Sequence, residues 1–119
     1  MADTLNKFKD LFCLEVEEQL AVLSKTLLRL EQTPEGPELY ETLMRSAHTI
    51  KGGAATMGYA QMAKLAHALE DLFHAGERRA IILDPKAISL SFAAIDIMSL
   101  SLVSIKDKNE ERHYIYCSK

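Results

Sequence analysis

Apolar residues recur at intervals of three and four along most of the chain, and the first such segment is the longest. It forms one stripe among lysines and glutamates, which is typical of an amphipathic helix. The stripe consists of Leu5, Phe8, Phe12, Val16, Leu20, Leu23, Leu27 and Leu30. The segment Thr33-Pro34-Glu35-Gly36-Pro37 then interrupts the helical pattern. We therefore predict a helix from about Thr4 to Glu31.

Two shorter helices are predicted in the middle of the chain. The second runs from Glu38 to Met57 and closes near Gly58, because glycine tolerates the left-handed backbone that often ends a helix. The third begins just past Gly58, and Gly76 followed by Glu77-Arg78-Arg79 marks its end. The inward positions of the two helices are Leu39, Leu43, Ala47, Ile50, Ala54 and Met57, then Met62, Leu65, Ala66, Leu69, Leu72 and Phe73.

A fourth helix is predicted to start at Asp84-Pro85, where an aspartate N-cap precedes a proline in the first turn. Its inward positions are Ile88, Phe92, Ile95, Met98 (or Ser99), Leu102 and Ile105. Residues 106–119 begin with a charged run and end with Tyr114-Ile115-Tyr116-Cys117-Ser118-Lys119, which fits either a short fifth helix or a linker stub. We assign residues 1–105 to one domain and residues 106–119 to this extension.

Four amphipathic helices with short connections predict an all-α fold, an antiparallel up-and-down four-helix bundle. The 119 residues, 48% of them hydrophobic, suffice for one domain with its own core. No stretch approaches the roughly 20 uninterrupted apolar residues of a membrane span, and the N-terminus lacks the features of a signal peptide. We expect a cytoplasmic protein that does not engage a membrane.

The net charge and the spacing of the cysteines argue against two classes of function, nucleic-acid binding and metal binding through cysteine. The net charge is -3, from 17 acidic and 14 basic residues, and the basic residues are scattered, so nucleic acid is not an expected partner. Cys13 and Cys117 lack metal-ligand spacing and are expected to stay reduced in the cytosol.

His48 is the most informative polar residue, because at about 100° per residue it lies roughly opposite the apolar stripe of its helix. Lys51, three residues on, is a near neighbour of the imidazole. An exposed histidine beside a lysine and two glycines is a candidate phosphate acceptor, and Lys51 would hold the charge of the transferred phosphoryl group.

A docking surface is predicted around His48. Gly52 lies directly above the imidazole and presents no side chain, and Gly53 follows it, although each glycine inside a helix costs about 1 kcal/mol relative to alanine. We infer that they leave room for another protein to reach the histidine. Arg45 and Ala55 fall on or beside the same side, and Met44 borders it.

On the third helix, His67, Glu70 and His74 share a flank away from the apolar stripe. This flank faces His48 if the second and third helices are neighbours. Glu70 would then accept a hydrogen bond from Nδ1–H of His48, fix the tautomer and leave Nε2 as the nucleophile. We expect His67 to add a second hydrogen bond or tune the same network, and His74 to be a surface residue.

These residues match a known family. The stretch Met44-Arg45-Ser46-Ala47-His48-Thr49-Ile50-Lys51-Gly52-Gly53-Ala54-Ala55-Thr56-Met57-Gly58, followed by Leu65-Ala66-His67-Ala68-Leu69-Glu70-Asp71-Leu72-Phe73, closely resembles histidine phosphotransfer (HPt) domains. The nearest variety is the N-terminal domain of CheA-type chemotaxis histidine kinases, and the likeness covers about residues 5–105. It implies that His48 is phosphorylated at Nε2, with Lys51, His67 and Glu70 around it.

The resemblance also implies a relay in two-component signalling. His48 would take the γ-phosphoryl of ATP from a kinase domain and pass it to an aspartate on the receiver domain of a response regulator. The chain would be the phosphoacceptor and phosphodonor domain of a histidine kinase, a transferase, with no cofactor of its own, since the partner kinase domain would bind ATP and Mg. Consistently, Gly53 and Gly58 have the spacing of a phosphate loop, but Tyr59-Ala60 follow them.

Two other functions are weighed against this relay. A metal-binding bundle would use His67, Glu70, His74 and His48, but the paired Glu-x-x-His motifs of di-metal bundles are missing and the charge of Lys51 opposes a cation. A structural dimerisation module would leave Gly52 and its neighbour unexplained. Within the relay, the charged tail favours a domain excised from a multidomain kinase over a free-standing protein.

Overall fold

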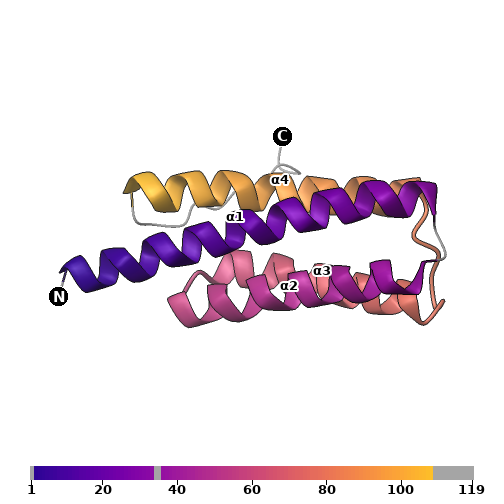
Figure 1. Ribbon diagram of the computed structural model, residues 1–119, viewed down its shortest axis with the longest axis horizontal. Coiled ribbons are helices and arrows are strands. Elements are labelled where there is room, and N and C mark those ends of the chain that lie inside the picture. Colours follow the sequence, from indigo (N-terminus) through magenta and orange to yellow (C-terminus); the bar gives the residue numbers. More distant parts are fainter. Residues whose placement is uncertain (1, 34–35, 109–119) are drawn as a thin grey trace.

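The computed structural model describes residues 2–33 and 36–108, which form four α-helices and contain no strand. The helices are α1 (Ala2–Gln32), α2 (Pro37–Met57), α3 (Ala60–Glu77) and α4 (Pro85–Lys108). They run alternately in opposite directions, with α1 beside α4 and α2 beside α3 (Figure 1). The predicted all-α antiparallel bundle is confirmed.

The core forms where the apolar stripes of the helices meet. Among its fully buried side chains are Val16, Leu23, Leu27, Leu30, Leu43, Ile50, Met62, Phe73, Met98 and Ile105. Burial of one such side chain stabilises the fold by about 1.5–3 kcal/mol. The positions predicted to be inward that lie only half-buried, at the core edge, are Met57, Leu65, Leu72 and Phe92. The interface between α2 and α3 is the most extensive in the bundle, so these two helices are well fixed relative to each other.

Two predicted helix boundaries are confirmed by their local geometry. Gly58 ends α2 with a φ of 84°, in the left-handed region, and the N–H of Tyr59 donates to the carbonyl of Ala54 at 2.8 Å. At the start of α4, the backbone N–H of Ala87 donates to Oδ1 of Asp84 at 2.9 Å. Pro85 is the first residue of α4 and has no backbone N–H. No hydrogen bond is lost, because an N–H at the first helical position has no partner within the helix.

The predicted end of α3 is confirmed, since the helix ends at Glu77 within the Gly76-Glu77-Arg78-Arg79 stretch, but the role of Gly76 differs from that of a helix stop. Gly76 does not end the helix, which continues through Glu77, and it is buried. The left-handed residue is instead Arg79, with a φ of 60°. Gly76 serves packing: a Cβ there would lie 2.6 Å from Cδ1 of Leu83 and 2.8 Å from Cε1 of Tyr40. The helix–loop contact therefore requires a residue without a side chain.

We predict opposite stability effects for alanine at two glycines. Gly76→Ala should lower the free energy of unfolding by about 1–3 kcal/mol, because the end of Leu83 can shift but the Tyr40 ring is held in the core. Gly52→Ala should raise it by up to about 1 kcal/mol, because a Cβ there meets nothing within 4 Å and alanine favours the helix. Urea unfolding followed by circular dichroism measures both, and equal effects would refute the packing role of Gly76.

The first helix is longer than predicted at both ends, and part of its apolar stripe is not covered. Phe8, predicted to be inward, is 56% exposed, and the side chain of Leu5 lies outside the described residues. The N-terminal part of α1 extends beyond the α2–α3 pair (Figure 1). Further along α1, the ring centroid of Phe12 lies 5.4 Å from that of Tyr59.

The expectation that no stretch has roughly 20 uninterrupted apolar residues holds for α4, which Asp96 and several serines interrupt, although the mean hydropathy of this helix is high. Residues 85–107 are long and apolar enough to cross a bilayer, by length and composition alone. In the structure, α4 instead packs against α1 and, less extensively, α3, as the core helix of a bundle does. The helix also extends through Lys108, past the predicted boundary at residue 105. The remainder of the predicted fifth helix or linker, residues 109–119, lies outside the described residues.

Candidate functional site

His48 lies on the outer side of α2, because the stripe that anchors this helix points the other way. Leu43, Ala47, Ile50 and Ala54 are buried completely, whereas the His48 side chain is 65% exposed. The predicted outward position of the imidazole is therefore confirmed. The ring is held by a packed helix and remains accessible to a large partner.

Glu70 reaches His48 from the neighbouring helix. It lies at the edge of the buried face of α3, next to Leu69, and its side chain is only 13% exposed. Nδ1 of His48 lies 2.9 Å from Oε2 of Glu70. An ionised carboxylate only accepts hydrogen bonds, so Nδ1 carries the proton and donates it. In the neutral imidazole, Nε2 then keeps its lone pair free, as the sequence predicted.

Lys51 is paired with the other oxygen of the same carboxylate. Its Nζ lies 2.8 Å from Oε1 of Glu70, and the lysine side chain is 30% exposed. Burial of Glu70 disfavours its ionised form, but the hydrogen bonds from Lys51 and His48 outweigh this effect and lower the pKa of the carboxyl group. Glu70 therefore stays ionised at neutral pH and holds both basic side chains on one flank.

The surface beside His48 contains the open space that the sequence predicted. A Cβ at Gly52 would meet nothing within 4 Å, and Ala55 is exposed. Arg45 is exposed and lies 3.6 Å from Glu41 on the same helix. This face of α2 therefore presents small side chains near the imidazole and one exposed charged pair.

Two other residues predicted for docking face inward. Gly53 is half-buried and looks toward α1, where an added Cβ would lie 3.5 Å from the ring of Phe12. Met44 is half-buried and packs against the core. Gly53 and Met44 therefore contribute mainly to the packing of α2 against the core, and less to an exposed docking surface.

His67 does not take part in the His48 contacts. It is exposed, and its Nε2 lies 3.6 Å from Oδ2 of Asp71, one turn further along α3. No hydrogen bond joins it to His48 in the described part of the chain. Its predicted role in the network stays a prediction. His74 is half-buried near the end of α3.

A polar contact between Ser46 and Gln19, which the sequence did not predict, holds the inner side of α2 near the site. The hydroxyl of Ser46, which is buried, donates to Oε1 of Gln19 on α1 at 2.7 Å. In the sequence, Ser46 and Gln19 each lie beside the buried stripe of their helix. This pattern does not show which two polar residues form a pair. This hydrogen bond fixes α2 relative to α1 at a position two residues before His48.

A metal centre finds no support in the described residues. Within residues 2–33 and 36–108, no three histidine, cysteine, aspartate or glutamate side chains are placed to hold a metal ion. Both oxygens of Glu70 already contact the side chains of Lys51 and His48. The geometry instead offers an exposed ring nitrogen as a nucleophile, with a carboxylate behind it and an ammonium group beside it.

Comparison with known proteins places this site in a family context. The family model described as Hpt domain matches residues 7–101. The chemotaxis protein CheA of Bacillus subtilis is 32% identical over 111 residues, which are 93% of this chain and 16% of that protein. CheA of Listeria monocytogenes is 48% identical over 63 residues, 53% of this chain and 10% of that protein. The chain thus spans a small part of the curated relatives it matches.

Solved structures agree in fold. The CheA phosphotransferase domain from Thermotoga maritima superposes with a TM-score of 0.80 at 35% identity, over 83% of this chain and 94% of that chain. The solution structure of a histidine phosphotransfer domain of CheA gives a TM-score of 0.76 at 34% identity, over 93% of this chain and 84% of that chain.

Proposed function

Because the chain belongs to the Hpt domain family, we propose that it acts in histidine phosphotransfer in chemotaxis-type two-component signalling, with His48 as the phosphoacceptor. The observation that carries this proposal is the exposed imidazole whose Nδ1 is hydrogen-bonded to Glu70, since this bond leaves Nε2 as the reactive atom. A CheA-type kinase and a response regulator are the partners that the similarity supports.

The chemistry requires two transfers at one atom. The lone pair of Nε2 attacks the γ-phosphorus of ATP, the bond between that phosphorus and the bridging oxygen breaks, and ADP leaves with the electron pair. Because Nδ1 keeps its proton, the phosphorylated ring is a cation, and the Glu70 carboxylate 2.9 Å away stabilises it. An aspartate oxygen of the receiver domain then attacks the same phosphorus, and the lone pair returns to Nε2.

Each neighbour has a defined part in this scheme. Lys51 is near enough to turn from Glu70 toward the phosphoryl oxygens on His48, where its charge offsets theirs. The partner kinase domain supplies ATP and Mg²⁺, and the chain itself acts as substrate and donor. The relay would operate in the cytoplasm, where kinase and response regulator are both available.

Labelling by a kinase tests the proposal directly. The chain is incubated with labelled ATP and a CheA-type kinase core that lacks its own phosphotransfer domain, and the labelled product is treated with acid or base. Phosphohistidine should give a label that acid removes and base does not. A base-labile or acid-stable label would contradict the proposal, as would no label with several active kinase cores.

Bulk at Gly52 should hinder both transfers. Gly52→Leu should slow labelling and dephosphorylation by a receiver domain about tenfold, because the new side chain occupies the open space above His48 without contacting the core. Ala68→Leu, an exposed position roughly opposite Glu70 on α3, is the matched control and should stay near wild type. Equal rates for the two leucine variants would show that Gly52 does not border the docking surface.

A further inference from the structure

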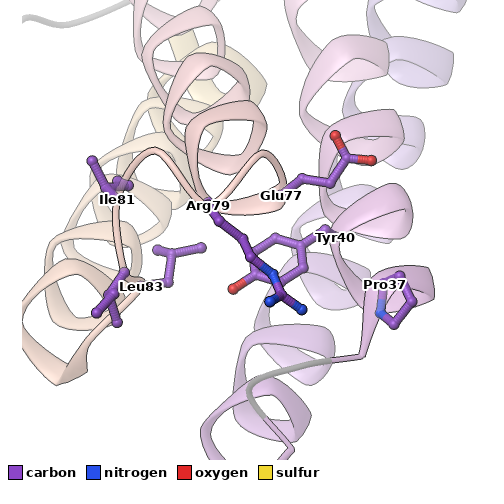
Figure 2. Close-up of a pocket in the computed structure, with 8 residues that line it drawn as sticks. Pro37, Tyr40, Glu77, Arg79, Ile81 and Leu83 are labelled. Atoms are coloured by element: carbon purple, nitrogen blue, oxygen red, sulfur yellow. The ribbon is translucent and has the colours of Figure 1, made fainter.

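A concave surface lies where the α3–α4 connection meets the start of α2 (Figure 2). The cavity has a volume of about 330 Å³ and is lined by Pro37, Tyr40, Glu77, Arg79 and residues 81–83, together with Gly76. His48 is not among its lining residues, and Tyr40 precedes His48 by eight residues, or about 12 Å along the helix. This surface, here called the Arg79 cavity, is therefore separate from the phosphotransfer site.

The walls of the Arg79 cavity are largely apolar. Tyr40 and Leu83 are buried and form its inner part. Ile81 is 40% exposed and Ile82 is 84% exposed at its edge. Ile81 and Ile82 are thus exposed side by side on a loop beside the cavity, whereas Ile50, Ile88, Ile95 and Ile105 are buried within the bundle and Ile97 is half-buried. A ligand that covers them would remove apolar surface from water.

Among the described residues, Arg79 is the one basic residue that lines the cavity, and it is not paired with the one acidic lining residue, Glu77. The Arg79 side chain extends across the cavity near Tyr40, and the carboxylate of Glu77 points away from its guanidinium group (Figure 2). No ion pair among residues 2–33 and 36–108 involves Arg79. The N-terminus of α2, at Pro37, lines the same cavity and adds the partial positive charge of a helix start.

The backbone at Arg79 does not explain why the residue is an arginine. Its φ of 60° belongs to the left-handed region, where glycine would close the same turn without steric cost. The turn itself is made by backbone groups, since the N–H of Arg79 donates to the carbonyl of Gly76 and that of Ala80 to the carbonyl of Ala75. The turn therefore does not require the side chain of Arg79.

We propose that the Arg79 cavity binds an extended segment of a partner protein in which a carboxylate stands next to a large apolar side chain. The carboxylate would accept hydrogen bonds from the guanidinium group, whose planar shape suits a carboxylate. The apolar side chain would pack on Ile82 and Leu83. The inference concerns a surface that the phosphotransfer reaction does not use, so it stands or falls independently of His48.

A peptide titration tests this assignment. Acetyl-Leu-Asp-Leu-amide is added to the ¹⁵N-labelled chain, and acetyl-Leu-Asn-Leu-amide serves as the neutral control. The acidic peptide should shift the amide resonances of residues 79–83 and Tyr40 saturably and leave that of His48 unchanged. Arg79→Gln should weaken binding about tenfold, whereas Arg78→Gln, which alters an exposed neighbour outside the cavity, should not.

Other outcomes would overturn the proposal. Equal shifts with both peptides, or equal affinity of Arg79→Gln and wild type, would remove the carboxylate from the recognition. Shifts at residues 81–83 that depend on protein concentration without peptide would identify a second copy of the chain as the occupant. Arg79→Gly is the control for misfolding, because glycine suits the left-handed backbone at this position. This variant should keep or raise the melting temperature and should still lose peptide binding. Retained binding would contradict the role of the side chain.

Discussion

His48→Gln should abolish acid-labile labelling by a CheA-type kinase core while the helical bundle remains folded. The side chain is 65% exposed, and its one hydrogen bond in the described structure is to Glu70, so the substitution removes no core contact. Glutamine has no nitrogen lone pair that can attack phosphorus, because its amide nitrogen is delocalised. The variant should therefore lose the label completely, with a helical circular dichroism spectrum and a melting temperature near those of wild type.

The chain contains four histidines, which supplies the control for this loss. His74→Gln changes a half-buried histidine of α3 that no proposed step uses, and it should be labelled at the wild-type rate. If His48→Gln stays labelled with the same acid lability, the acceptor is another histidine. In that case the exposed position of His48 on α2 has no catalytic meaning.

The sequence predicted the bundle well because the information lies in local periodicity and capping. Apolar spacing identified all four helices, and Gly58 and Asp84 identified two of their ends. The packing role of Gly76 could not be predicted, because it depends on Leu83 and Tyr40, which come close only in the folded chain. The exposure of Phe8 likewise depends on where the neighbouring helices stop.

The parts of the candidate site that depend on helix geometry alone could be predicted from the sequence. Angular position placed His48 outward and Glu70 on a flank, and their contact followed once α2 and α3 proved to be neighbours. The pairing of Lys51 with Glu70 was not predicted, since the sequence does not show that one carboxylate serves two basic groups. The approach of Gln19 to Ser46 depends on the register between α1 and α2, which the sequence pattern leaves open.

The second large effect is expected at Glu70. Glu70→Ala should slow phosphoryl gain by His48 about ten- to a hundredfold, comparable with the cost of removing a carboxylate that orients a metal-bound histidine. The variant loses the acceptor that keeps the proton on Nδ1, so part of the population presents Nε2–H, which cannot attack phosphorus. It also loses the negative charge that stabilises the cationic phosphorylated ring.

Glu70→Gln separates these two contributions. Its amide oxygen still accepts from Nδ1–H but carries no charge, so its rate should lie between those of Glu70→Ala and wild type. Asp71→Asn changes the adjacent, exposed carboxylate and should leave the rate within about twofold. The measurement is the initial rate of labelling at saturating kinase, with melting temperatures to verify folding. An unchanged rate in Glu70→Ala would remove Glu70 from the mechanism, because tautomer control and charge compensation both depend on this one carboxylate.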